Sequence, residues 1–202
     1  MTGHFYKNLN LHQLILDKRP KVILEVGSGD GLCTRLLAAL APSVPCVIHA
    51  ISDKVLDIPS VQWTTGISYK EIKKLADNSI GLCIIDTDHN YWTLEQELLA
   101  LIPKMEEGGL VVLHDVEEFY YNTGMAMSYW NNEPYPEKEI LASAVKGGTG
   151  LCLLDFLVAC RGTFKLVRWI PEHYGCAVII KRITTGTQLV QPGPDSVFAR
   201  PT

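Results

Sequence analysis

Residues Lys21–Leu40 read KVILEVGSGDGLCTRLLAAL, and this stretch decides the fold. Its first part, Val22–Val26, is a mostly apolar run of the kind that forms a strand buried on both faces. Glycines follow at positions 27, 29 and 31, and leucines then recur at helical spacing as far as Leu40. A strand, a glycine turn and a helix in this order place free backbone N–H groups against a bound ligand.

The charge of the turn indicates what kind of ligand it binds. Its pattern is Gly-x-Gly-x-Gly, without the spacing of a dinucleotide-binding turn and without the Lys-Ser/Thr ending of a P-loop. Asp30 lies inside the turn and Glu25 lies just before it, so two carboxylates would repel a pyrophosphate. We therefore expect an electropositive or zwitterionic ligand, which disfavours a NAD-dependent oxidoreductase.

The composition is that of one ordinary globular domain. The chain has 202 residues, of which 47% are hydrophobic and 20% charged, and its net charge of −4 argues against a nucleic-acid backbone as the partner. Six scattered cysteines without a Cys-x-x-Cys pair predict free thiols in a reducing compartment. The first residues lack the apolar core of a signal peptide, and no apolar run is long enough to cross a bilayer. We expect a cytoplasmic protein that binds neither nucleic acid nor membrane.

Strands and helices alternate along the rest of the chain. Further strands are predicted at residues 46–52, 61–65, 80–85, 110–113, 164–169 and 176–182. Helices are predicted at 9–17, 69–77 and 149–161, and another is expected to begin at the capping-box pattern Thr93-x-x-Gln96 and to end at Gly108-Gly109. This alternation predicts an α/β fold, namely a Rossmann-like, doubly wound, mostly parallel sheet with an antiparallel closing strand.

Polar side chains follow the predicted strands at the edge where sheets of this kind bind ligands: Asp53, Asp86, Asp88, His89, His114 and Asp115. Asp53 has the spacing of a ribose-binding carboxylate, with Asp57 as the second candidate. The other carboxylates and imidazoles are ligand types that hold Mg²⁺ or Mn²⁺, which lowers the pKa of a bound hydroxyl. In the competing interpretation the aspartates only cap the next helix, or a histidine acts as a base without a metal.

The stretch EVGSGDG resembles the first motif of class I S-adenosylmethionine (SAM) methyltransferases, in which the loop wraps the methionine part of SAM. Ser68 follows Gly66-Ile67, where related enzymes often have Gly-Asp with the Asp directed toward the adenine. Ile67 leaves that contact to backbone groups and apolar stacking. The resemblance implies a set of SAM-binding residues: Glu25, Gly27, Ser28, Gly29, Gly31, Asp53, Ser68 and Asp86.

The span from IDTDHNY to LHDV is similar to the metal-dependent O-methyltransferases related to cephalosporin hydroxylase and macrocin O-methyltransferase. In those families an Asp after the fourth strand and an acidic pair after the fifth bind the ion. The similarity implies Asp86, His114 and Asp115 as metal ligands, and Asp88 or His89 as the catalytic base. A histidine at position 114 replaces Asp or Glu and shifts the preference from Mg²⁺ toward Mn²⁺, Fe²⁺, Co²⁺ or Zn²⁺.

Together these features predict a SAM-dependent methyltransferase domain over residues 1–183 and a polar tail over 184–202. The expected acceptor is a hydroxyl of a small metabolite. Because little sequence precedes the first strand, we expect the acceptor pocket to be built from later segments, chiefly 117–149, or from a second subunit of a homodimer. The alternatives are a non-catalytic SAM-fold binding module and a metal-independent methyltransferase with a His base.

Overall fold

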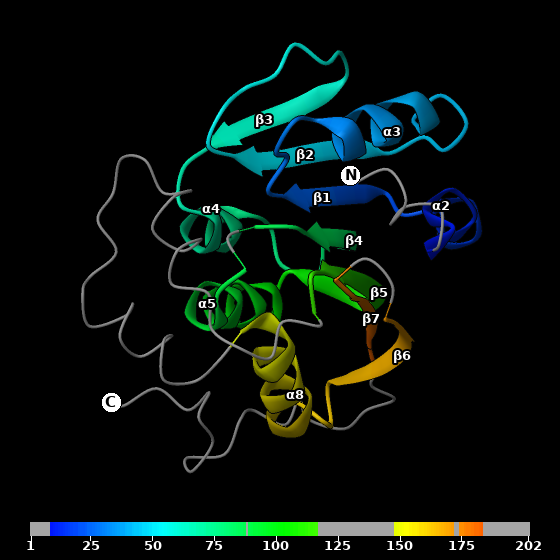
Figure 1. The fold of residues 1–202 in the computed structure, drawn as a ribbon. Coiled ribbons are helices and arrows are strands. Elements are labelled where there is room, and N and C mark those ends of the chain that lie inside the picture. The colour runs from blue at the N-terminus through cyan, green and yellow to red at the C-terminus, as the bar shows by residue number, and fades with distance from the viewer. Residues whose placement is uncertain (1–8, 88, 117–147, 172–173, 184–202) are drawn as a thin grey trace.

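The computed structural model describes residues 9–87, 89–116, 148–171 and 174–183 (Figure 1). Nearly all of the predicted acceptor segment, the predicted tail and Asp88 lie outside these residues. None of the described helices has the length and apolar character that a bilayer span requires. All six cysteines are free, and five of them are buried, as the sequence predicts.

The described strands form one seven-stranded sheet, in the order β3-β2-β1-β4-β5-β7-β6. The first five are parallel, and β7 runs antiparallel to both β5 and β6. This confirms the predicted doubly wound sheet with an antiparallel closing strand. The strands are β1 (Val22–Val26), β2 (Val47–Ser52), β3 (Val61–Thr65), β4 (Ile80–Ile85), β5 (Met105–His114), β6 (Phe164–Ile170) and β7 (Cys176–Lys181).

Helices cover both faces of the sheet, so the domain has three layers. They are α2 (Leu11–Lys18), α3 (Leu32–Leu40), α4 (Ser68–Lys74), α5 (Tyr91–Leu101) and α8 (Thr149–Ala159). Successive strand residues point to opposite faces and therefore feed two separate cores. The core under α4, α5 and α8 includes Leu24, Val26, Cys83, Ile85, Val111 and Leu113. The core under α2 and α3 includes Ile23, Ile48, Leu82, Ile84, Leu110 and Val112.

Both predicted ends of α5 are wrong. The helix begins at Tyr91, because Asn90 is its N-cap and accepts a hydrogen bond from the backbone N–H of Thr93 at 2.8 Å. The predicted capping box therefore lies inside the helix. The helix also ends at Leu101 instead of at Gly108-Gly109, and these glycines belong to the long strand β5.

The glycine turn packs directly on the end of β4. Gly27 has φ +84°, and a Cβ at this position would lie 2.0 Å from the carbonyl oxygen of Asp86. The backbone N–H of Asp86 donates to the carbonyl of Val26 at 2.9 Å. Only a residue without a side chain allows the two chains to come this close, so Gly27 fixes where the turn lies relative to Asp86.

At the opposite edge of the sheet, Lys181 joins three segments. Its side chain is buried, and its Nζ donates to the carbonyls of Met105 at 2.7 Å and Ile102 at 3.1 Å and to Asn78 Oδ1 at 3.4 Å. Burial lowers the pKa of this ammonium group. The lysine thus supplies donors to carbonyls at the end of α5 and the start of β5.

Replacing Gly27 by Ala should destabilise the fold much more than the same change at Gly29. Gly29 also has a positive φ, of +49°, but a Cβ there would meet nothing within 4 Å. We expect Gly29→Ala to cost about 1 kcal/mol for its left-handed backbone, and Gly27→Ala to cost roughly 3 kcal/mol or more because of the clash. Urea unfolding of both variants measures the difference, and equal costs would contradict the proposed backbone constraint.

Lys181→Met should lower the free energy of unfolding by roughly 2 kcal/mol or more, because buried carbonyls lose their donors. Lys165→Met on the exposed side of β6 is the matched control and should change it by less than about 0.5 kcal/mol. Chemical denaturation checks both values. A Lys181→Met protein as stable as the control would show that these hydrogen bonds add nothing to the fold.

Candidate active site at the carboxyl edge of the sheet

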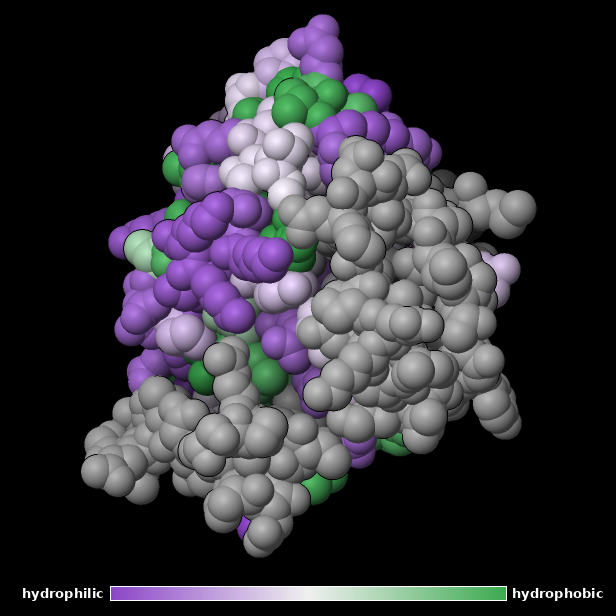
Figure 2. All heavy atoms as spheres, turned by 90° about the vertical axis from the view of Figure 1, so that its left-hand side faces the viewer, coloured by the Kyte–Doolittle hydropathy of each residue, from purple (hydrophilic) through white to green (hydrophobic). Residues whose placement is uncertain are grey.

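The five parallel strands all end at one edge of the sheet, on the left in Figure 1. Figure 2 faces this edge and shows mainly hydrophilic side chains over its described part. The predicted residues that the structure describes lie in these strand ends or within five residues after them. One edge therefore brings together residues that are up to 90 positions apart in the sequence, from Glu25 to Asp115.

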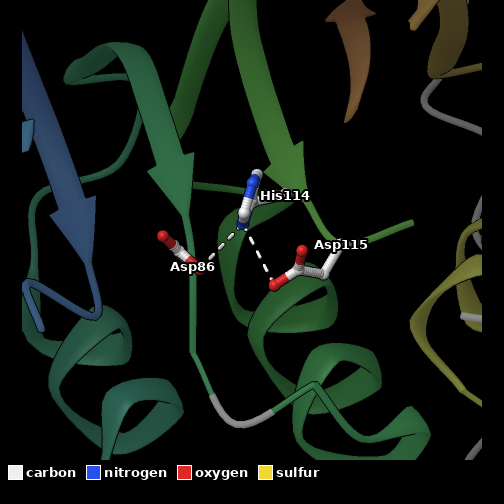
Figure 3. A group of neighbouring side chains, drawn as sticks. All are labelled: Asp86, His114 and Asp115. Carbon is white, nitrogen blue, oxygen red and sulfur yellow. Dashed lines mark hydrogen bonds and ion pairs between the residues drawn. The ribbon is translucent and has the colours of Figure 1, made fainter. Parts of the chain in front are cut away.

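Asp86, His114 and Asp115 form a compact cluster (Figure 3). Asp86 directly follows β4, His114 is the last residue of β5, and Asp115 comes next. His114 Nδ1 lies 3.2 Å from Asp86 Oδ1 and 3.0 Å from Asp115 Oδ2. One ligand atom from each residue lies within 4.8 Å of the other two.

His89 completes a network of two carboxylates and two imidazoles. Its Nε2 lies 2.7 Å from Asp115 Oδ2 and 3.5 Å from Asp86 Oδ1. The residue has φ +51°, in the left-handed region that favours glycine, and Asp115 has φ +55°. Asp88, the other predicted base, lies outside the described residues.

The network shifts the pKa of each of its members. Burial alone would lower the pKa of both imidazoles, but hydrogen bonds to Asp115 and Asp86, together with their charges, raise the pKa of His89 to about 10 and that of His114 to about 9. The same contacts outweigh burial at Asp86 and Asp115 and lower the pKa of each carboxyl. Without an ion, two imidazolium groups therefore neutralise two carboxylates.

The donor set fits a divalent cation. Two carboxylates and one imidazole are ligands that Mn²⁺ and similar ions accept, and waters or a substrate would fill the remaining positions. Asp115 Oδ1 is buried and has no hydrogen-bond partner among the described residues. A buried carboxylate oxygen without a donor is costly, and a cation would satisfy it.

Glu25 lies behind the glycine turn and is almost fully buried, with 1% of its surface exposed. Its Oε2 accepts hydrogen bonds from Thr34 Oγ1 at 2.6 Å and from Ser28 Oγ at 3.2 Å. Burial raises the pKa of Glu25, and the nearby charge of Asp86 raises it further, against those hydrogen bonds. Its Oε1 has no partner among the described residues, which suits a ligand with an N–H or ammonium donor.

The remaining predicted cofactor residues lie along the same edge. Ser68 begins α4, and its buried Oγ has no hydrogen-bond partner in the described part of the chain. Asp53 follows β2, is exposed, and accepts a hydrogen bond from Ser52 Oγ at 3.1 Å. Gly29 and Gly31 form the turn with Gly27. The ligand contacts of all these residues stay predictions.

Two residues that support the site carry little signal in the sequence. Thr34 holds Glu25, and its signal was weak: a threonine in the first turn of α3, among apolar neighbours. Glu97 is fully buried in α5, and its Oε2 accepts a hydrogen bond from Thr87 Oγ1 at 3.2 Å, next to Asp86. Spacing along the helix could have placed Glu97 on the buried face, but not against this loop.

Comparison with known proteins agrees with this fold. Residues 24–116 match the family model Methyltransf_24, described as a methyltransferase domain. A proposed O-methyltransferase from Klebsiella pneumoniae is structurally similar, with a TM-score of 0.62, 14% identity, and coverage of 91% of this chain and 82% of the other. An O-methyltransferase from Bacillus cereus in complex with S-adenosylhomocysteine (SAH) has a TM-score of 0.58 and 14% identity, covering 90% and 82%.

MycE, a methyltransferase of the mycinamycin biosynthetic pathway in complex with Mg, SAH and mycinamycin VI, also has a TM-score of 0.58. The identity is 17%, and the match covers 93% of this chain but 51% of MycE. The sequence matches no curated protein. The family match places a methyltransferase domain on the segment that carries the glycine turn and the acidic cluster, and the fold agrees. Residues 24–116 therefore match a methyltransferase domain, and the described residues have the class I methyltransferase fold that the sequence predicts.

Proposed function

We propose that the protein transfers the methyl group of SAM to a hydroxyl of a small molecule, with a divalent ion held by Asp86, His114 and Asp115. The observation that carries this proposal is the contact between the cofactor turn and the acidic cluster. Gly27 packs on the carbonyl of Asp86, and the carboxylate of Asp86 belongs to the cluster. A donor on the turn and an acceptor at the cluster would therefore be neighbours, which is the main requirement of methyl transfer.

The predicted cofactor residues would contact different parts of SAM. The turn of Gly27, Gly29 and Gly31 lets the backbone approach the methionine part closely, and the buried Oε1 of Glu25 offers an acceptor to its ammonium group. Asp53 is assigned to the ribose hydroxyls. Ser28 and Ser68 complete the predicted set. SAM, when bound, supplies a methyl group on a positively charged sulfur.

At the cluster, side chains of this protein would take up the proton that the acceptor hydroxyl loses. A divalent ion held there would supply positive charge in place of the two imidazolium protons and would acidify an adjacent hydroxyl. A neutral His89 that donates from Nε2 to Asp115 has Nδ1 as its proton acceptor. His89 Nδ1 can therefore receive the hydroxyl proton, and Asp115 would stabilise the resulting imidazolium. Asp88 remains the other predicted base.

A structurally similar protein supports the metal assignment. MycE is in complex with Mg, SAH and mycinamycin VI, so a methyltransferase with a similar fold binds a divalent ion as well as the cofactor product. In this chain the ligand set includes a histidine, which favours Mn²⁺ or Co²⁺ over Mg²⁺. We therefore propose Mn²⁺ as the first ion to test.

Asp115→Asn should reduce both ion binding and methyl transfer. Asparagine keeps the shape of the side chain and tolerates a left-handed backbone, but it removes the charge. We expect Mn²⁺ affinity to fall about 10-fold or more and transfer of labelled methyl groups from SAM to a panel of sugars and phenols to fall about 100-fold or more. Titration calorimetry and the transfer assay measure these changes.

Asp77→Asn is the matched control, because Asp77 is an exposed carboxylate paired with Lys104 in a different part of the surface. It should leave both quantities unchanged. A wild-type protein that binds neither SAH nor Mn²⁺ would contradict the proposal, as would an Asp115→Asn protein that binds Mn²⁺ normally.

The complete ion-pair network also supports a second candidate, a metal-independent methyltransferase in which His89 or His114 is the base. Exhaustive chelation separates the two candidates. We expect treatment with EDTA to abolish methyl transfer, and added Mn²⁺ to restore it. Full activity after chelation, with residual metal excluded by elemental analysis, would instead establish the histidine-base mechanism.

A further inference from the structure

The first turn of α8 lies against the acidic cluster, although it is more than thirty residues from Asp115 in sequence. The chain leaves the described residues at Val116 and re-enters them at Gly148, the N-cap of this helix. Thr149 is the first helical residue, and 4% of its surface is exposed. The resemblance to known families assigns no role to this segment.

Thr149 forms a hydrogen bond to the backbone of Asp115, one of the three proposed metal ligands. Its Oγ1 donates to the carbonyl oxygen of Asp115 at 2.5 Å. Asp115 has a left-handed backbone, which persists only where its surroundings hold it. The next N–H, of Val116, bonds the carbonyl of Gly175 at a longer 3.4 Å. Of these two hydrogen bonds on the peptide between Asp115 and Val116, the one from the threonine hydroxyl is the shorter. The orientation of this peptide determines where the Asp115 carboxylate points.

The residue before Thr149 is tied to the other loop of the site. Gly148 forms an isolated antiparallel bridge with Asn90, which follows His89. One helical turn of α8 therefore contacts both loops that carry the network. A second hydrogen bond, from Tyr91 OH to Asp155 Oδ2 at 2.7 Å, fixes α8 against α5.

We propose that Thr149 is a positioning residue that sets the placement of Asp115 relative to His89 and His114, and thereby the affinity of the cluster for a divalent ion. The ion-binding part of this inference rests on the proposed function. The hydroxyl acts through the Asp115 peptide and contacts neither the ion nor a substrate. Its loss would let that peptide relax and would move the carboxylate away from its partners, while α8 keeps its own backbone hydrogen bonds.

Three variants test the inference in the full-length protein. Thr149→Val removes the hydroxyl and keeps the shape, whereas Thr149→Ser keeps the hydroxyl. Thr163→Val is the matched control, because Thr163 is equally buried just beyond the other end of α8. Calorimetric titration with Mn²⁺ should show binding about 10-fold weaker for Thr149→Val. The Thr149→Ser and Thr163→Val proteins should bind like the wild type.

A second readout needs no metal. The 2.7 Å pair between His89 Nε2 and Asp115 should give a downfield ring N–H signal in nitrogen-15 spectra of the metal-free protein. We expect the signal to shift in Thr149→Val and to stay in place in the other two variants. If Thr149→Val does not fold, Thr149→Ala takes its place in both measurements.

Normal Mn²⁺ binding and an unshifted signal in Thr149→Val would overturn the inference. Equal losses in Thr149→Val and Thr163→Val would overturn it as well, because they would reflect only the stability of α8. If the wild type binds no Mn²⁺, the metal part of the proposed function fails, and the ring signal alone decides whether Thr149 positions Asp115.

Discussion

The arrangement of the site depends on the close contact between two backbones at the centre of the sheet. Gly27 and Asp86 follow adjacent parallel strands, and the absence of a side chain at Gly27 brings the glycine turn onto the Asp86 carbonyl. That contact joins the half of the edge that the sequence assigns to the cofactor with the half that carries the acidic network. A wider gap between the glycine turn and Asp86 would hold the methyl donor farther from the acceptor hydroxyl.

Sequence patterns predicted the central sheet well because buried strands are continuous apolar runs. The strands at 61–65 and 80–85 appear with the predicted bounds. The start of β5 was missed because residues 105–109, Met-Glu-Glu-Gly-Gly, have little strand propensity. Pairing of Met105 with Ile80 places this segment in the sheet, and no local pattern reveals such pairing. Likewise, Asn90 is the N-cap of α5 in place of the predicted Thr93, because the Asn90 side chain accepts a hydrogen bond from the backbone N–H of Thr93. Only the structure shows this hydrogen bond.

The sequence predicted which residues form the candidate site, but not the contacts between their side chains. Strand ends gave Asp86, His89, His114 and Asp115, because parallel strands place their carboxyl ends together. The sequence could not show that both imidazoles lie between the same two carboxylates, nor that the charges balance without an ion. It also could not show Thr149, because that contact crosses a separation of 34 residues.

His89 and Asp115 both have a left-handed backbone, which lowers the stability of the fold at two positions that the proposed chemistry needs. Glycine would adopt these angles without strain, so selection for a more stable fold alone would favour it there. The proposed mechanism instead requires an imidazole and a carboxylate. A relative that has abandoned catalysis but kept the scaffold should therefore gain stability by accepting glycine at either position, and retention of the strained pair in a homologue would mark a working enzyme.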